Sequence, residues 1–259
     1  MERKEERSLL RDRIKERRRK IQETHEAALN ILEAEEREVQ PPQINGKLRS
    51  FALRVPTQIQ KCSGIVIFGR RIRSLVFTTD IATIRNVDAD AVLAVYPYTP
   101  QQIITEALVH SADIPIFAGV GGGLTQGKRV VNLATFAEMQ GASGVVVNSP
   151  TKNEVIHELA DTIDIPIIVT AVSAEGIQER VESGAAIINV AAGSQTPEVV
   201  AAIRKQFPEL PIIATGGPTD ESLEQTIAAG ANAIVWTPPT PGEVFKEIMA
   251  AYRKGEAHP

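Results

Sequence analysis

The sequence has little of several residue types, and each shortage excludes a class of protein. Cys62 is the only cysteine among 259 residues, which excludes an internal disulfide and favours a reducing compartment. Aromatic residues make up 4%, so a core must be built from Ile, Val, Leu and Ala. No apolar run reaches the roughly 18 residues of a membrane span, and Met1 begins a charged segment unlike a signal peptide. We expect a cytoplasmic globular protein with no membrane partner.

Charge and histidine usage exclude further classes. The net charge is −4, so the chain as a whole has no electrostatic bias toward nucleic acid. The four histidines fall on predicted helices or in the C-terminal tail, whereas metal hydrolases need histidines at a shared site. No G-x-S-x-G motif occurs, and no lysine lies in the later predicted strands for Schiff-base chemistry. We expect neither a metal nor a cofactor.

Residues 1–40 form a distinct, highly charged segment. They contain no glycine or proline and many good helix formers, which predicts a helical arm that ends before the "PPQING" stretch. Residues 1–20 hold ten Lys or Arg against five acids, and residues 21–40 hold one Arg against six. Two antiparallel copies would pair opposite charges, so the pattern predicts a homo-oligomer. A solvated helix packed on its own domain is an equally good interpretation.

A repeat begins near residue 73, after a lead-in segment over 41–72. "DIPIF", "DIPII" and "ELPII" each begin an apolar strand, and "GASGVVV", "GAAIINV" and "GANAIVW" each end a helix and enter another strand. Eight strand–helix units in sequence predict a (β/α)₈ TIM barrel over 73–259, with an open doubly wound sheet as the alternative. The predicted strands are 74–78, 91–95, 115–118, 144–148, 166–170, 186–190, 211–215 and 232–236.

The carboxyl ends of barrel strands carry the active sites of TIM-barrel enzymes. In this chain most of these ends hold Thr or Asn, which form good hydrogen bonds but are poor acids or bases. We expect Thr78, Asn148, Thr170 and Asn189 to orient a bound ligand. The mouth of the barrel is therefore predicted to be polar and nearly uncharged.

Two glycine-rich turns are candidate anion sites. Gly216 and Gly217 precede a predicted helix whose free N–H groups favour an anion, although "TPPT" after the last strand supplies few donors. Gly121, Gly122 and Gly123 form the second turn, where several glycines would be a costly choice for structure alone. We expect both turns to contact the ligand. A tight strand–helix turn explains Gly216 and Gly217 nearly as well.

Two ionisable residues are candidates for catalysis. Asp80 is the only carboxylate directly at a strand end in the first half of the barrel, so it is the best general base. An N-cap of the next helix is at least as good an explanation for Asp80. Lys152 follows the fourth strand and could meet an anionic substrate, or it could be a solvated residue early in a helix.

Three stretches carry a resemblance: "RSFALRVPTQIQKCSGIVIFGRRIRSLVFTTDIATIRNVDADAVLAVYPYTPQ", "GVGGGLTQGKRVVNLA" and "IIATGGPTDESLEQTIAAGANAIVWTPPT". Together they resemble a bacterial barrel family labelled only "hydrolase". "ATGGPTD" and "AAGANAIVW" are more distantly similar to phosphate-binding barrels such as thiamine-phosphate synthase. The resemblance implies a hydrolase-type enzyme acting on a small, anionic or phosphorylated metabolite.

Two other functions remain open from the sequence. A regulatory barrel that only senses its ligand would also have a polar mouth poor in acids and bases. The glycerol-uptake antiterminators provide the analogy on this fold. An RNA-contacting arm over residues 3–20 is the third reading, and interspersed acids with no aromatics weaken it.

Overall fold

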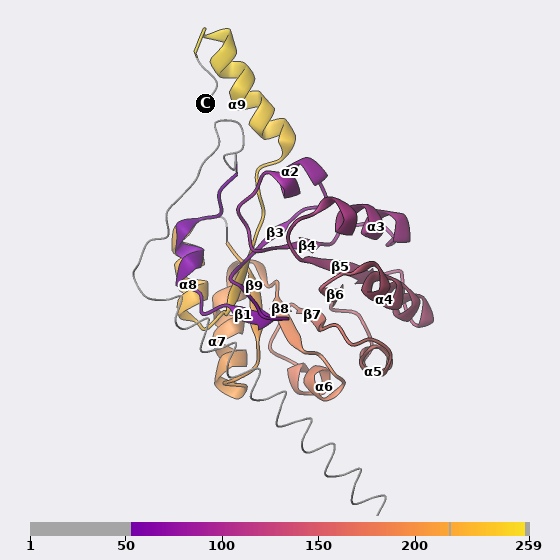
Figure 1. The fold of residues 1–259 in the computed structure, drawn as a ribbon. Helices are drawn as coiled ribbons and strands as arrows, with labels where there is room; N and C mark the ends of the chain where they lie inside the picture. Colours follow the sequence, from indigo (N-terminus) through magenta and orange to yellow (C-terminus); the bar gives the residue numbers. More distant parts are fainter. Residues whose placement is uncertain (1–52, 218, 257–259) are drawn as a thin grey trace, which may run out of the picture. The chain divides into compact units, whose positions relative to one another are not determined.

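The computed structural model describes residues 53–217 and 219–256. The predicted arm over 1–40 lies outside the described residues. Eight parallel strands form a closed barrel in the order β10-β3-β4-β5-β6-β7-β8-β9, which confirms the (β/α)₈ prediction (Figure 1). The strands are β3 Ser74–Phe77, β4 Ala91–Ala94, β5 Ile116–Gly121, β6 Gly144–Val147, β7 Ile167–Ala171, β8 Ile187–Val190, β9 Ile212–Thr215 and β10 Ala233–Trp236.

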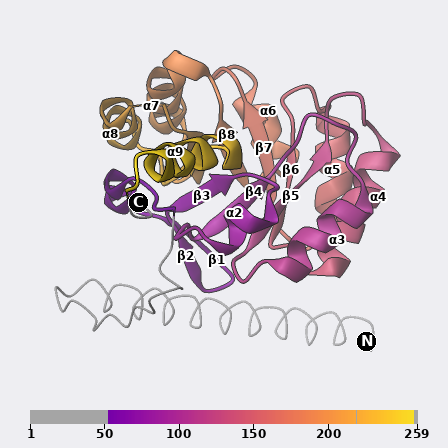
Figure 2. The same cartoon turned by 90° about the horizontal axis from the view of Figure 1, so that it is seen from above.

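Helices alternate with these strands, and all but the last lie around the outside of the barrel (Figures 1 and 2). They are α2 Ile81–Arg85, α3 Gln102–Ser111, α4 Lys128–Gln140, α5 Asn153–Thr162, α6 Ile177–Glu182, α7 Thr196–Gln206, α8 Asp220–Ala228 and α9 Pro241–Arg253, with two short 3₁₀ helices, η1 Thr57–Lys61 and η2 Gly193–Gln195. None of α9 is buried. Among the described residues, no helix is both long and apolar enough to cross a bilayer.

The internal repeat has a structural explanation at both of its motifs. Gly141, Gly184 and Gly230 have φ of 96°, 110° and 107°, so each ends a helix in the left-handed conformation that glycine adopts most easily. The prolines of the other motif precede a strand, where a missing N–H is tolerated. Their carbonyls accept from the neighbouring strand, as in the 3.0 Å bond from Val145 N to Pro166 O. The repeat therefore marks where each unit turns.

Two parts of the lead-in segment pack against the barrel. The antiparallel strands β1 Ile65–Ile67 and β2 Arg70–Ile72 contribute Ile65, Ile67 and Ile72 to the cluster that fills the barrel interior. Upstream, Ile59 of η1 is fully buried in the cluster between sheet and helices. Burial of this apolar surface fixes the segment to the barrel.

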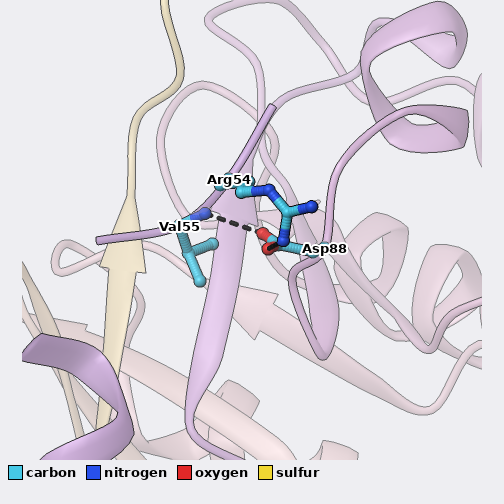
Figure 3. Close-up of polar contacts among 3 residues, drawn as sticks. All are labelled: Arg54, Val55 and Asp88. Carbon is cyan, nitrogen blue, oxygen red and sulfur yellow. Dashed lines mark hydrogen bonds and ion pairs between the residues drawn. The ribbon is translucent and has the colours of Figure 1, made fainter. Parts of the chain in front are cut away.

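Asp88 anchors the first described residues of this segment (Figure 3). Its Oδ1 accepts from the backbone N–H of Val55 at 2.7 Å, and its Oδ2 lies 3.8 Å from Nη1 of Arg54. The backbone of Leu53 also pairs with that of Asp88, whose N–H donates to the Leu53 carbonyl at 3.2 Å. The loop before β4 thus holds this segment through both the side chain and the backbone of Asp88.

Candidate functional site

The inside of the barrel changes from apolar to polar toward the strand ends. Val146, Ile168, Ile187 and Ile213 belong to the apolar cluster that fills the interior. Since alternate residues of a strand face the same side, the residues two positions further on face the interior above this floor. They are Asn148, Thr170, Asn189 and Thr215, which we call the mouth residues. Three of the four were predicted to orient a ligand, and the strand pattern brings them to one face.

Asn189 is the most buried of the mouth residues. Its side chain is 4% exposed, and its Nδ2 donates to Oγ1 of Thr170 across 3.4 Å. Its Oδ1 is buried with no hydrogen-bond partner among the described residues. A buried amide oxygen without a donor costs about 1–3 kcal/mol. The oxygen is therefore ready to accept a hydrogen bond from a bound molecule.

Of the four mouth residues, Asn148 lines a cavity of about 140 Å³, which we call the mouth cavity. It extends from Asn148 and Gly119 to the loop after β4, where Tyr96 and Tyr98 line it. The Tyr96 hydroxyl accepts from the Gln101 N–H at 2.9 Å and is thereby fixed. Tyr98 is 76% exposed, so its ring is free to cover a ligand at the entrance.

The glycine turn after β5 serves the fold at two of its three positions. Gly121 and Gly122 have φ of 138° and 101°, which side chains rarely adopt. A Cβ on Gly122 would lie 2.1 Å from Oγ1 of Thr151, whereas a Cβ on Gly123 would meet nothing within 4 Å. Gly121 and Gly123 line the mouth cavity. Ligand contact at Gly121–Gly123 stays a prediction, and Gly123 is the position without a steric reason for glycine.

The turn after β9 also has a packing explanation. A Cβ on Gly216 would lie 2.3 Å from Cδ2 of Leu223, and one on Gly217 would lie 2.1 Å from Oγ of Ser222. These glycines let α8 approach the sheet closely. Gly216 and Gly217 also line a cavity of about 410 Å³ at the start of α8. A phosphate there stays a prediction.

Electrostatics at that turn are mixed. Thr219 caps α8 by accepting from the Ser222 N–H at 3.2 Å, which uses one of the free helix donors. Asp220 and Glu221 then occupy the first turn and are exposed. Acids at a helix N-terminus already satisfy its dipole. The cavity at α8 therefore attracts an anion less strongly than an uncapped helix start would.

The two predicted catalytic residues do not line the mouth cavity. Oδ1 of Asp80 accepts from the Thr83 N–H at 2.6 Å, so its carboxylate is the N-cap of α2. Oγ1 of Thr78 accepts from the Asp80 N–H at 3.1 Å and shapes the same turn. Lys152 is the N-cap residue of α5, is exposed, and lines a separate cavity between α4 and α5. Their roles in catalysis stay predictions.

Thr151 is a residue that the sequence analysis missed. It is 3% exposed, its Oγ1 has no hydrogen-bond partner among the described residues, and it lines the same cavity as Lys152. The only signal in the sequence is its position directly before a predicted helix. Its contact with Gly122 depends on two loops that only the barrel brings together.

Two further kinds of candidate are the Cys62 thiol and side chains that could bind a metal ion. Burial raises the pKa of the Cys62 thiol to about 12, which keeps it protonated and unreactive at neutral pH. Among residues 53–217 and 219–256, no group of three or more His, Cys, Asp or Glu side chains is arranged to hold a metal ion.

Comparisons with known proteins identify the fold. No family model matches the chain, and no curated protein matches it. A structure of phosphonopyruvate hydrolase in complex with oxalate and Mg²⁺ is 14% identical with a TM-score of 0.55, covering 78% of this chain and 89% of that one. Phosphoenolpyruvate phosphomutase from Streptomyces platensis subsp. rosaceus is 13% identical with a TM-score of 0.54, covering 71% and 83%.

A third neighbour matches a resemblance noted in the sequence. Thiamine phosphate pyrophosphorylase from Pyrococcus furiosus is 17% identical with a TM-score of 0.50, covering 63% of this chain and 84% of that one. At such identities these structures show that the chain has a TIM-barrel fold. They do not transfer an activity, because one fold hosts many functions.

Proposed function

We propose that this chain is a TIM-barrel enzyme of the hydrolase type whose mouth binds a small, polar, anionic metabolite. The observation that carries the proposal is the buried Oδ1 of Asn189, which has no partner among the described residues. It faces the interior together with Asn148, Thr170 and Thr215, above an apolar floor. A small molecule with a donor group would satisfy Oδ1 and use the neighbouring hydroxyls.

The shape of the mouth supports a small ligand. The mouth cavity of about 140 Å³ is lined by Val146 of the apolar cluster and bordered by Tyr96, Tyr98 and Gly123. The similar structures support the class of ligand, since their names refer to a phosphonate and to phosphorylated compounds. A phosphoryl or carboxylate group on the metabolite would reach one of the helix N-termini around the mouth.

A ligand-sensing barrel is the second candidate, and one observation favours it. The mouth residues are amides and hydroxyls, while the Asp80 carboxylate caps a helix. A general base needs a titratable group within hydrogen-bond reach of the substrate. A barrel that binds without reacting needs only the polar groups that the mouth supplies.

One experiment in two stages tests both candidates. Thermal-shift screening of phosphorylated and carboxylated metabolites identifies ligands, because a ligand that binds only the folded chain raises its melting temperature. Each hit is then incubated with the protein and followed by ³¹P and ¹H NMR. Product formation supports the enzyme. Saturable binding of every hit without product supports the sensor, and the absence of any hit counts against both.

A further inference from the structure

A second cavity lies on the rim of the barrel, outside the mouth. It has a volume of about 300 Å³ and is lined by Gly122, Gln126, Gly127, Thr151 and Lys152, with Val130 and Val155 at its apolar side. We call it the rim cavity. Gly122 faces the rim cavity while Gly121 and Gly123 face the mouth cavity, so one glycine turn separates the two.

Two helices begin at the rim cavity without a side-chain cap. Gly127, the N-cap residue of α4, has no side chain, and Lys152, the N-cap residue of α5, makes no side-chain cap bond. The helices have 13 and 10 residues, respectively. The N–H groups of Val130 and Val155 donate to the N-cap carbonyls of Gly127 and Lys152. The first two N–H groups of a helix have no partner within it and lie at the positive end of its dipole. Both helix starts therefore offer donors that suit an anion.

Thr151 is an independent sign of a ligand in the rim cavity. Its side chain is 3% exposed, and Oγ1 has no hydrogen-bond partner among the described residues. The Thr151 backbone is fully used, because its N–H donates to Asn148 O at 3.0 Å and its carbonyl accepts from Nη1 of Arg180. A buried hydroxyl without a partner is costly. An oxygen of a bound anion would accept from this hydroxyl.

The charges around the rim cavity are mainly positive. Lys128 lies in the first turn of α4, which holds no acid, and its charge opposes the helix dipole unless an anion is bound. Arg180 is half-buried behind the loop and donates to Ser149 O at 2.8 Å and to Oδ1 of Asn153 at 2.9 Å. Glu154 is the acid in the first turn of α5. Lys152 at the helix start adds a further cation.

We infer that the rim cavity binds a tetrahedral oxyanion, namely a phosphate group. Its oxygens accept from the first N–H groups of α4 and α5, those of Lys128, Asn153 and Glu154, and from the hydroxyl of Thr151. The Lys152 ammonium balances the charge. The site does not depend on whether the mouth is catalytic. The proposal gives Lys152 a binding role in the rim cavity, which it lines, and not in the mouth cavity, which it does not line.

The test is an NMR titration of the full-length chain with inorganic phosphate at constant ionic strength, with chloride as the replaced anion. We expect saturable shifts of the amides of Lys128, Asn153 and Glu154. A parallel titration with glycerol 3-phosphate distinguishes a free phosphate site from one for a phosphorylated metabolite. Saturable binding of either compound supports the site, and the compound that binds more tightly shows whether the site takes free phosphate or a phosphorylated metabolite. The absence of saturable shifts with both compounds overturns the proposal.

Matched variants locate the binding. Thr151→Val keeps the shape and removes the hydroxyl, and Lys152→Met removes the charge; each should weaken phosphate binding by about tenfold. Thr151→Ser keeps the hydroxyl and should bind like the unchanged chain. Lys205→Met removes an exposed lysine in the last turn of α7 and is the charge control. Equal affinity in all four variants would overturn the proposal.

Two further readouts keep the result interpretable. The melting temperature of Thr151→Val without phosphate should equal or exceed that of the unchanged chain, because the lost hydroxyl had no partner. If Thr151→Val does not fold, Lys152→Met against Lys205→Met still decides. Asn189→Leu should leave the phosphate shifts intact, so failure at the mouth and failure at the rim cavity give different results.

Discussion

Nδ2 of Asn189 donates to the hydroxyl of Thr170 across 3.4 Å, while Oδ1 of the same amide is buried without a partner among the described residues. The long bond and the unused oxygen mean that the fold gains little from this amide. Residues that cost stability at a concave site are commonly those that function requires. The pair is therefore the centre of the proposed ligand site.

Replacing Asn189 with leucine should stabilise the free protein. The substitution removes a buried unpaired oxygen and adds apolar contact, so the free energy of unfolding should rise by about 1–2 kcal/mol. Urea unfolding followed by circular dichroism measures the change. A loss of stability would mean that the amide is satisfied in the fold, most simply by an internal water, and would weaken the case for a ligand.

Replacing Gly122 with alanine should destabilise the protein by at least about 2 kcal/mol, because overpacking and an unfavourable φ act together. The new Cβ would lie 2.1 Å from Oγ1 of Thr151, at a φ of 101°. Gly123→Ala is the matched control, since a Cβ there meets nothing within 4 Å. Similar melting temperatures for the two variants would contradict the described loop.

Asp80 can be tested for its role as a helix cap. Asp80→Asn keeps an oxygen that accepts from the Thr83 N–H, so stability should change by less than roughly 0.5 kcal/mol, whereas Asp80→Ala should lose about 1 kcal/mol. Thermal unfolding measures both. Turnover of any substrate found in the screen adds a separate test. Asp80→Asn should keep the turnover if Asp80 only caps α2, and should abolish it if Asp80 is the general base.

The buried thiol of Cys62 should make stability fall at alkaline pH. Its pKa is about 12 in the folded chain and 9.0 when unperturbed, so between these values the folded state binds the extra proton. Stability is complete below pH 9 and should then fall by up to about 1.4 kcal/mol per pH unit from this group. Urea unfolding of the unchanged chain and of Cys62→Ala between pH 8 and 10.5 measures the difference. If the free energy of unfolding fell equally with pH in the two proteins, the burial of the Cys62 thiol would be contradicted.

The charged segment over 1–40 predicts self-association that salt weakens. Its halves carry opposite net charge, and pairing between copies would be screened at 1 M salt. Size-exclusion chromatography with light scattering should give a larger mass for the full chain than for a truncation lacking 1–40. If the full chain and the truncation had the same number of copies per particle at both low and high salt, the segment would not join copies.

The sequence predicted the barrel well because the motifs of its repeat mark where helices end and strands begin. Each predicted strand lies within one residue of the observed one except β5, which continues to Gly121 through an irregular register after Gly119. Glycines in that stretch concealed the extension, since they are poor strand formers. The helix-ending glycines at 141, 184 and 230 gave the unit boundaries.

The site was only partly predictable from the sequence. Asn148, Thr170 and Asn189 could be placed on one face because strand alternation is a rule of local geometry. The contact between Gly122 and Thr151 could not be, because it joins two loops that follow different strands. The capping role of Asp80 was foreseen as an alternative, but only coordinates show which atom its carboxylate accepts from.

Isothermal titration of the unchanged chain and of Asn189→Leu with the strongest ligand from the metabolite screen tests the central claim most directly. We predict saturable binding to the unchanged chain and at least about a tenfold loss of affinity in the variant, because the ligand's donor would lose the buried acceptor Oδ1 of Asn189. Equal affinity in the two proteins would contradict the claim that the mouth of the barrel is the binding site.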